Sequence, residues 1–544
     1  MTLNIDSLID DNDIHLESYI PIQHIHCDNK KSCNSIFYNL IPVQRLVKYC
    51  NLNSVAIKSD DEIEIKISRY HHDKTVSTST MTCNQNYSTI NFSNELFITI
   101  QTMDSVKTCV QLTIYAKPIF FNNIKLAHVI CTYRNNPLVI EKINKIPFTI
   151  DNNYHLFIID NGNTIDYDSN EKVTIITSPN YGGSAGFTRG IIESINNDYT
   201  HILLNDDDAI YEYESIFRTI SFYSLVNPKY QDICLSGICL DKDCPNIVYD
   251  AGGVCKKNTI TLLNRDMDIT EIDDIITLFE EKRIDYSAWT YACFSTSIFK
   301  KKGLPLPMFF QYDDVEYGIR SKVKNVTIPG IFVLHHRSTG IRTNIYYSTR
   351  NSLITALCHK QYDYNDIDKL FNMILAEMAA YRYDYVKKEI KAIKDVLKGP
   401  DYVFMLCKKG PIDVIDNLKT DKIENLRKLT CVTNSNYSRK KIVKIITLNG
   451  LILPSLGDLE TDQTDYNTSH FYRIKKVLYP VDKDFGFITK RSFKKTITLL
   501  VEIVLLKQIM KMKIHKISKK YNNSISHYSS MDFWLSLLGQ TKHT

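Results

Sequence analysis

Three consecutive aspartates, Asp206, Asp207 and Asp208, directly follow the apolar segment 201–205. Carboxylates that leave a buried strand side by side raise one another's pKa values, and a divalent cation relieves that cost. In an extended segment, Asp206 and Asp208 point to one side and Asp207 to the other. Mg²⁺ and Mn²⁺ prefer such oxygen ligands and keep coordination sites open for substrate phosphates. We expect Asp206 and Asp208 to bind a metal ion; a solvated acidic turn is the alternative.

A second acidic pair, Asp313 and Asp314, follows the aromatic stretch 309–312. Apolar surroundings would partly desolvate these carboxylates and tune one of them towards general-base catalysis. An acidic helix start explains the segment equally well. Downstream, His335 and His336 follow the apolar strand predicted over 331–334, and a histidine at that place is a candidate third metal ligand.

Four successive apolar segments each end in a polar cluster. The segments are 125–131, 155–159, 172–176 and 201–204, and the clusters contain Thr132 and Arg134, Asp160, Gly182 and Gly183, and the three aspartates. Segments between several of these strands are long enough for a helix, which predicts βαβ units and a largely parallel sheet. Ligands bind at the carboxyl ends of such strands. Loops alone would explain each cluster, but they explain all four together poorly.

The elements that would hold these residues divide the chain into three predicted domains of an α/β protein. Residues 1–120 contain period-two alternation and turns rich in Asn, Ser and Thr, which predict a small β-sandwich. Residues 121–350 carry the Rossmann-like βα pattern, and residues 351–544 are predicted to be helical. The segment 490–520 has ten Lys or Arg and one acid, which predicts a basic amphipathic helix.

The composition of the chain argues against several classes of function. A net charge of +5 over 544 residues argues against general nucleic-acid binding. The 14 cysteines fit no zinc-ribbon spacing. The first eleven residues are acidic and lack an apolar signal core, and the apolar run 496–506 is too short to span a bilayer. These features predict a cytoplasmic protein, peripheral at most on the inner face of the plasma membrane.

Taken together, these motifs resemble inverting family-two glycosyltransferases with the GT-A fold, and within them bacterial galactofuranosyltransferases. The resemblance covers residues 125–355. It rests on segments 130–134, 180–190 and 205–208, on Trp289, and on segments 303–310, 312–318, 329–335 and 346–351. The flanking regions resemble that family in layout only.

The resemblance implies a role for each matching residue. Thr132 and Arg134 would bind the uridine diphosphate, with Asp160 near the uracil or ribose. Asp206 and Asp208 would hold Mn²⁺ or Mg²⁺, completed by His335. Asp314 would be the general base, with Asp313 and Trp289 shaping the pocket for the donor sugar and the acceptor.

The residues themselves suggest close backbone approach of a ligand at Gly182 and Gly183, and leave Asp207 to face the nucleotide or its ribose. Two features depart from the family: Thr290 replaces a second tryptophan, and His336 is a rival to His335.

The expected activity is transfer of galactofuranose from UDP-galactofuranose to a growing cell-surface glycan or lipid-linked acceptor during polysaccharide biosynthesis in the cell envelope. Alternatives are a pyranose or rhamnose nucleotide donor, a metal-dependent phosphoryl-transfer enzyme, and a non-catalytic carbohydrate-binding protein. The basic helix over 490–520 fits an anionic membrane surface or an ordinary solvated helix. The acceptor is undetermined, and a homo-oligomer is compatible with the sequence.

Overall fold

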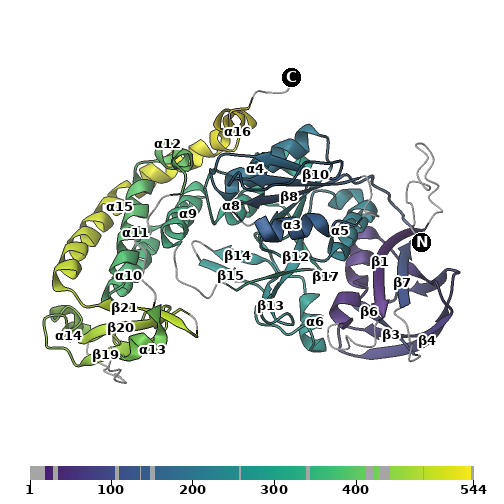
Figure 1. Cartoon of the computed structure of the whole chain (residues 1–544), viewed down its shortest axis with the longest axis horizontal. Helices are drawn as coiled ribbons and strands as arrows, with labels where there is room; N and C mark the ends of the chain where they lie inside the picture. The colour runs from purple at the N-terminus through teal and green to yellow at the C-terminus, as the bar shows by residue number, and fades with distance from the viewer. Residues whose placement is uncertain are drawn as a thin grey trace. The chain divides into compact units, whose positions relative to one another are not determined.

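The computed structural model describes residues 19–27, 35–103, 110–134, 136–147, 153–256, 259–337, 344–411, 421–428, 441–481 and 483–540. The acidic N-terminal segment discussed above lies outside these ranges. The chain forms two compact units (Figure 1): residues 1–306, 313–337 and 529–544 belong to the first, and residues 307–312 and 338–528 to the second. The predicted mixed α/β class is confirmed. Within the described ranges, no helix is long and apolar enough to cross a membrane.

Two antiparallel sheets begin the first unit. One has the order β1 (Ile20–Cys27), β7 (Val110–Ala116), β2 (Ser54–Ser59), β5 (Ser88–Asn91), and the other β4 (Val76–Cys83), β3 (Ile63–Tyr70), β6 (Phe97–Thr102). Ile65 of β3 and Leu112 of β7 are buried in one core, so both sheets bury their inner faces together. Two helices, α1 (Ser35–Asn39) and α2 (Val43–Cys50), interrupt the region predicted as strands. Helix α2 buries Leu46 and leaves Val47 exposed, as expected for an amphipathic helix.

An eight-stranded sheet forms the centre of the first unit. Its order is β10 (Val173–Thr177), β9 (Tyr154–Asp160), β8 (Leu126–Thr132), β11 (His201–Asp206), β16 (Ala292–Ser295), β12 (Cys234–Asp241), β13 (Val248–Asp250), with β17 (Asn325–His335) paired to β12. The first four strands are parallel, as predicted. Strand β16 runs antiparallel to both neighbours, so the sheet is mixed rather than largely parallel.

The remaining elements of the first unit surround this sheet or extend it. They are α3 (Asn136–Asn144), α4 (Gly183–Asn196), α5 (Tyr213–Leu225), the 3-10 helix η2 (Pro228–Tyr230), β14 (Gly253–Lys256), β15 (Thr259–Leu262), α6 (Ile272–Leu278), α7 (Thr296–Lys302), α8 (Asp313–Ser321) and α16 (Met531–Leu538). Helix α4 lies directly on β8, because a Cβ atom on Gly190 would come within 2.2 Å of Val129 Cγ1. The close packing of α4 on β8 explains why position 190, at the end of the glycine-rich segment 180–190, is a glycine.

Strand register aligns the predicted site residues at one edge of the central sheet. Thr132 pairs with Asp160, and Cys131 pairs with Asp206. On the other side of the sheet, His335 ends β17 opposite Asp241 of β12. Since β11, β12 and β17 run in the same direction, their carboxyl ends meet at the same edge.

The second unit contains α9 (Ile345–Cys358), α10 (Tyr364–Ala379), α11 (Tyr383–Leu397), α12 (Pro400–Val403), η3 (Phe404–Lys409), β18 (Asp421–Lys422), α13 (Ile423–Lys428), α14 (Lys441–Ile446), β19 (Gly457–Glu460), β20 (Ile474–Pro480), β21 (Phe485–Lys490) and α15 (Phe493–Tyr528). The predicted boundary at residue 350 falls inside α9, and the C-terminal region contains a four-stranded sheet besides its helices. The helical spacing of apolar residues over 367–385 predicts one continuous helix face, but the chain breaks between α10 and α11, where Tyr381 has a φ of 60°.

Candidate metal and active site

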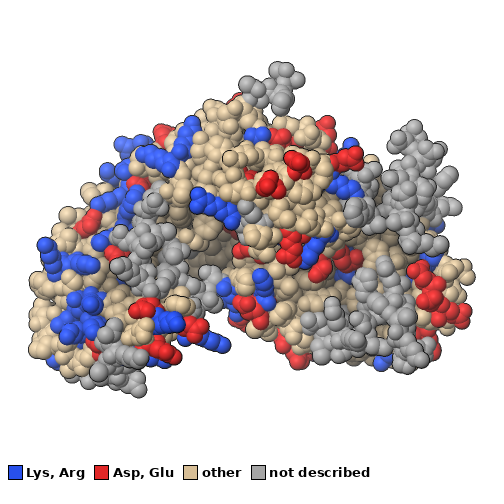
Figure 2. Space-filling model, viewed as in Figure 1, with Lys and Arg blue, Asp and Glu red and all other residues tan. Residues whose placement is uncertain are grey.

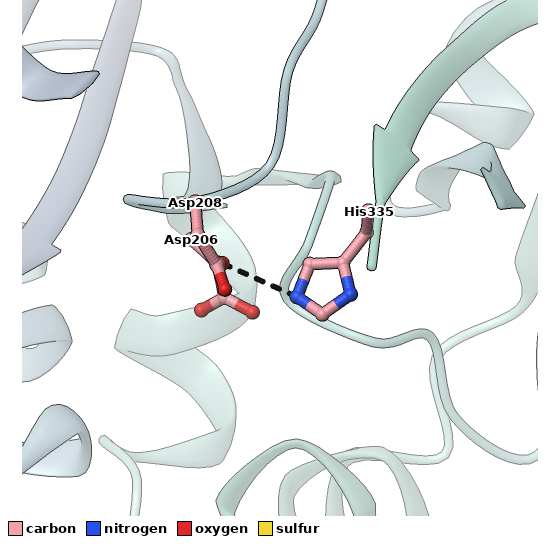
Figure 3. A group of neighbouring side chains, drawn as sticks. All are labelled: Asp206, Asp208 and His335. Carbon is pink, nitrogen blue, oxygen red and sulfur yellow. Dashed lines mark ion pairs between the residues drawn. The ribbon is translucent and has the colours of Figure 1, made fainter. Parts of the chain in front are cut away.

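Two carboxylates and an imidazole converge at the carboxyl edge of the central sheet (Figure 3). Asp206 is the last residue of β11, Asp208 lies two residues further on, and His335 ends β17; each offers a ligand atom, and these atoms all lie within 4.8 Å of one another. His335 Nε2 lies 3.2 Å from Asp208 Oδ1. Such a donor set and spacing fit one divalent cation, for which two carboxylates and one neutral imidazole are suitable ligands.

The pKa shifts of this cluster show that its carboxylates would favour a nearby positive charge. Burial raises the pKa of Asp206 to about 7, and the charge of Asp208 adds to the shift. A hydrogen bond from His335 lowers the pKa of Asp208. Burial lowers the pKa of His335, but its contact with Asp208 outweighs this and the net shift is upwards. A cation held between these carboxylates would relieve their repulsion.

The histidine next in sequence lies in a different setting. His336 is half exposed, and its Nδ1 lies 3.2 Å from Asp243, which is itself exposed. By contrast, the His335 ring lies parallel to that of Tyr249, with centroids 6.5 Å apart. The structure therefore brings His335 to the two aspartates and directs His336 away from them.

The second acidic pair begins helix α8. Asp314 Oδ1 accepts a hydrogen bond from the amide of Val315 at 2.7 Å. Burial raises the pKa of Asp314 well above its usual range, and the charges of Asp313, Asp206 and Asp250 act in the same direction. Burial raises the pKa of Asp313 to about 6. The pair thus lies close enough to Asp206 for their charges to interact.

Two residues predicted to bind the diphosphate lie at the end of β8. Thr132 Oγ1 donates a hydrogen bond of 2.7 Å to Asp207 Oδ2, which joins the ends of β8 and β11. Arg134 is exposed, has a φ of 64°, and stacks its guanidinium over Tyr133 at 5.0 Å. An exposed guanidinium at this edge is a suitable donor to an anionic ligand.

Asp160, the last residue of β9, is hydrogen-bonded to the loop that follows it. Its carboxylate accepts hydrogen bonds from the amides of Gly162 at 2.8 Å, Thr164 at 2.6 Å and Ile165 at 2.8 Å. These bonds hold the loop after β9 against the carboxylate, and the place of Asp160 near the uracil or ribose stays a prediction.

The glycine cluster and Trp289 serve the packing around the site. Gly182 precedes α4 with a φ of 89°, a conformation that favours glycine, and Gly183 is the first residue of the helix. Trp289 is buried and packs edge-on against Phe187 of α4 and Tyr317 of α8. Since α8 carries Asp313 and Asp314, Trp289 supports the helix that presents the acidic pair.

A buried lysine that the sequence did not single out lies behind the metal-binding cluster. Lys142 Nζ of α3 donates to the backbone oxygen of Asp206 at 2.8 Å and lies 3.3 Å from Asn205 Oδ1. Burial lowers the pKa of Lys142 to about 8, while the three aspartates oppose the shift. No sequence motif marks this residue; the available signal was a lysine among the apolar residues Leu138, Val139, Ile140 and Ile143.

The chain is similar to known glycosyltransferases over part of its length. Galactofuranosyltransferase GlfT2 of Mycobacterium tuberculosis is 26% identical over 262 residues, which is 44% of this chain and 41% of that protein. GlfT2 of Mycolicibacterium smegmatis is 26% identical over 265 residues, or 45% of this chain and 41% of that protein. The chain thus matches about two fifths of the length of these relatives.

No protein-family model matches the chain. Among solved structures, the mannosyltransferase PcManGT of Pyrobaculum calidifontis, in complex with GDP-Man and Mn²⁺, aligns with 53% of this chain and 80% of that one. The identity is 10% and the TM-score 0.30.

Proposed function

We propose that the chain is an inverting glycosyltransferase of family two that transfers galactofuranose from UDP-galactofuranose to a glycan or lipid-linked glycan acceptor. The observation that carries the proposal is the convergence of Asp206, Asp208 and His335 beside the half-buried pair Asp313–Asp314. The partial similarity to two galactofuranosyltransferases supports the choice of donor.

Each group has a task in this proposal. Asp206, Asp208 and His335 would hold Mn²⁺ or Mg²⁺, which would neutralise charge on the diphosphate leaving group. Thr132, Arg134 and Asp207, with the backbone at Gly182 and Gly183, would bind the nucleotide, with Asp160 near the uracil or ribose.

Asp314 would remove the proton from the acceptor hydroxyl as that oxygen attacks the anomeric carbon. The attack comes from the face opposite the diphosphate, so one displacement inverts the anomeric configuration. Asp313 and Trp289 would shape the pocket for the sugar and the acceptor. The raised pKa of Asp314 supports this role, because a base with a raised pKa holds the transferred proton more firmly.

The second unit suggests how a lipid-linked acceptor would be reached. Figure 2 shows many Lys and Arg side chains over this unit. Helix α15 also exposes apolar side chains, with Val504 50%, Leu505 59% and Met512 76% exposed. We propose that this helix face binds an anionic membrane surface on the cytoplasmic side.

The test of the activity is nucleotide release with Mn²⁺ from UDP-galactofuranose, UDP-galactopyranose, UDP-glucose and dTDP-rhamnose. We expect UDP release from the furanose donor alone, lost on chelation of the metal. Turnover of a pyranose or rhamnose donor would replace the galactofuranose assignment. No turnover with any of the donors would contradict the enzyme proposal, and glycan binding by the protein would then favour a carbohydrate-binding role.

A further inference from the structure

The carbonyl oxygen of Asp206 closes the turn that carries both proposed aspartate ligands. The amide of Ala209 donates to this oxygen at 3.3 Å, which forms a turn over residues 206–209 directly after β11. Asp208 lies within this turn, so the directions of the two carboxylates depend on its conformation. A carbonyl oxygen has a second lone pair, and Lys142 Nζ of α3 donates to it at 2.8 Å.

Lys142 makes further contacts that fix the position of its ammonium group. Its Nζ lies 3.3 Å from Oδ1 of Asn205 and 5.5 Å from the ring centroid of Tyr211. Lys142 is 8% exposed, and Asn205 is fully buried. A lysine is rarely buried without partners, because the removal of its charge from water is costly. The polar contacts at the end of β11 are therefore what holds this side chain in the interior.

Asn205 extends this set of contacts to the far side of β11. Its Nδ2 donates to the backbone oxygen of Thr290, in the segment before β16. Because Lys142 donates to Oδ1 of the same amide, both ends of that amide have a partner. One chain of hydrogen bonds thus joins α3, the end of β11 and the segment before β16, all within the first unit.

We propose that Lys142 is a positioning residue for the metal ion. It holds the carbonyl oxygen of Asp206 and so sets where the carboxylates of Asp206 and Asp208 stand. Groups that orient metal ligands contribute to affinity without contacting the ion. The proposal rests on the proposed function for the presence of a metal. Its sign is opposite to that of a charge effect, because loss of a nearby positive charge alone would strengthen cation binding.

The first experiment titrates Mn²⁺ alone into the full chain and measures the free ion by electron paramagnetic resonance. Lys142→Met keeps a long side chain but removes the donor, so the dissociation constant should rise by about 10–100-fold. Lys145→Met is the matched control, because Lys145 is exposed and pairs with Glu141 at 2.7 Å. The control should keep the wild-type dissociation constant. An unchanged or lower value in Lys142→Met would overturn the proposal.

A conservative variant separates positioning from charge. Lys142→Arg keeps both a donor and the positive charge, so it should bind Mn²⁺ more tightly than Lys142→Met does. Room for the larger side chain exists in an adjacent cavity of about 30 Å³, whose lining includes Leu138, Ile210, Tyr211 and Tyr213. Binding by Lys142→Arg no tighter than that by Lys142→Met would overturn the proposal. If Lys142→Met does not fold, the shorter Lys142→Gln replaces it, with Lys145→Gln as its control.

Hydrogen–deuterium exchange gives a readout that needs neither metal nor turnover. Without Lys142 the bond from Ala209 to Asp206 should open more often, so peptides covering 203–211 should exchange faster in Lys142→Met than in wild type. Peptides covering β10 should not. If the wild type binds no Mn²⁺, the metal part of the proposed function fails, while this measurement still decides whether Lys142 holds the turn. Unchanged exchange at 203–211 would overturn the positioning role in either case.

Discussion

At the scale of single residues, Asp314 is the group on which the proposed chemistry depends. Asp314→Asn keeps the shape of the side chain but cannot accept the acceptor proton. A general base contributes about 10²–10⁴-fold, so kcat should fall by that factor, while the donor KM stays close to the wild-type value. Steady-state kinetics with Asp243→Asn, an exposed carboxylate that pairs with His336, is the control. Wild-type turnover by Asp314→Asn would show that another group is the base.

The raised pKa of Asp314 predicts a pH effect of defined sign. The base works only when ionised, so kcat should fall as the pH drops through the pKa of Asp314. The charge of Asp250 contributes to raising that pKa. Asp250→Asn should therefore shift the acidic limb of the kcat profile to lower pH. A limb that stays in place or moves to higher pH would contradict this coupling.

The metal-binding cluster predicts different effects for two neighbouring histidines. His335→Ala removes one of the proposed ligands. Loss of a residue that merely supports a metal ligand lowers metal affinity by about 10–100-fold. The Mn²⁺ concentration for half-maximal activity should therefore rise by at least that factor. His336→Ala is the matched control, because His336 pairs with Asp243 instead. A larger effect from His336→Ala would reverse the assignment. Mn²⁺ titration of both variants decides between the two.

At the scale of elements, the contact between α4 and β8 is sensitive to a single methyl group. In Gly190→Ala the new Cβ would lie 2.2 Å from Val129 Cγ1. Overpacking of this kind costs about 1–3 kcal/mol, which should appear as a lower midpoint of denaturant unfolding. Val129→Ala in the same chain removes both clashing methyl groups and should recover part of the loss. Equal stability of Gly190→Ala and wild type would show that α4 can shift freely.

The sequence predicted the elements with the strongest periodicity. Strands β8, β9, β10 and β11 and the polar residues after them were expected, because apolar runs followed by polar clusters are local signals. The buried Ile63, Ile65 and Ile67 of β3 likewise follow from alternation. Strand β16 was not predicted, since its four residues, 292–295, resemble any short buried segment. Its antiparallel direction depends on pairing with β11 and β12, which the local sequence does not encode.

Within the candidate site, too, the local sequence predicts some residues but not the contacts that depend on packing. Asp206, Asp208 and His335 were proposed together from sequence, and the structure brings their side chains together. The position of Lys142 depends on how α3 packs behind β11, so the sequence did not reveal it. The hydrogen bonds that the amides of Thr164 and Ile165 donate to Asp160 were also not predicted. Local hydrogen bonds of this kind are hard to predict because several arrangements satisfy the same carboxylate.

At the scale of the whole molecule, two buried histidines predict acid sensitivity. Burial lowers the pKa of His128 to about 3 and that of His201 to about 4. The unfolded chain binds protons to both below about pH 6.5, so stability should fall with pH between these limits, by up to about 1.4 kcal/mol per pH unit for each histidine. The raised pKa values of Asp206 and Asp250 act with the opposite sign.

The variant His201→Gln separates the contribution of His201 to the pH dependence of stability from that of the aspartates. His201→Gln does not titrate, so its loss of stability between pH 7 and pH 5 should be smaller than that of wild type by about 2 kcal/mol. Denaturant unfolding at both pH values measures this difference. An identical loss in the variant would mean that His201 is protonated in the folded protein as readily as in the unfolded chain.

The proposed membrane-binding face of α15 predicts that membrane binding can be lost without a loss of thermal stability. Val504 and Leu505 are exposed on α15, whereas Ile503 and Leu506 are buried. Val504→Ser with Leu505→Ser should weaken sedimentation with vesicles containing anionic lipid while leaving the thermal midpoint close to wild type. Val47→Ser, at an exposed position of α2, is the control. Unchanged vesicle binding by the double variant would remove α15 from the proposal.

The split origin of the metal ligands has a consequence for synthesis of the chain. Asp206 and Asp208 emerge from the ribosome well before His335, and β17 joins the sheet by pairing with β12. A nascent chain that ends before β17 offers the ion two carboxylates but no imidazole. Tight Mn²⁺ binding would therefore mark completion of the central sheet, and ions bound at that moment would stabilise the finished unit over its partly folded precursors.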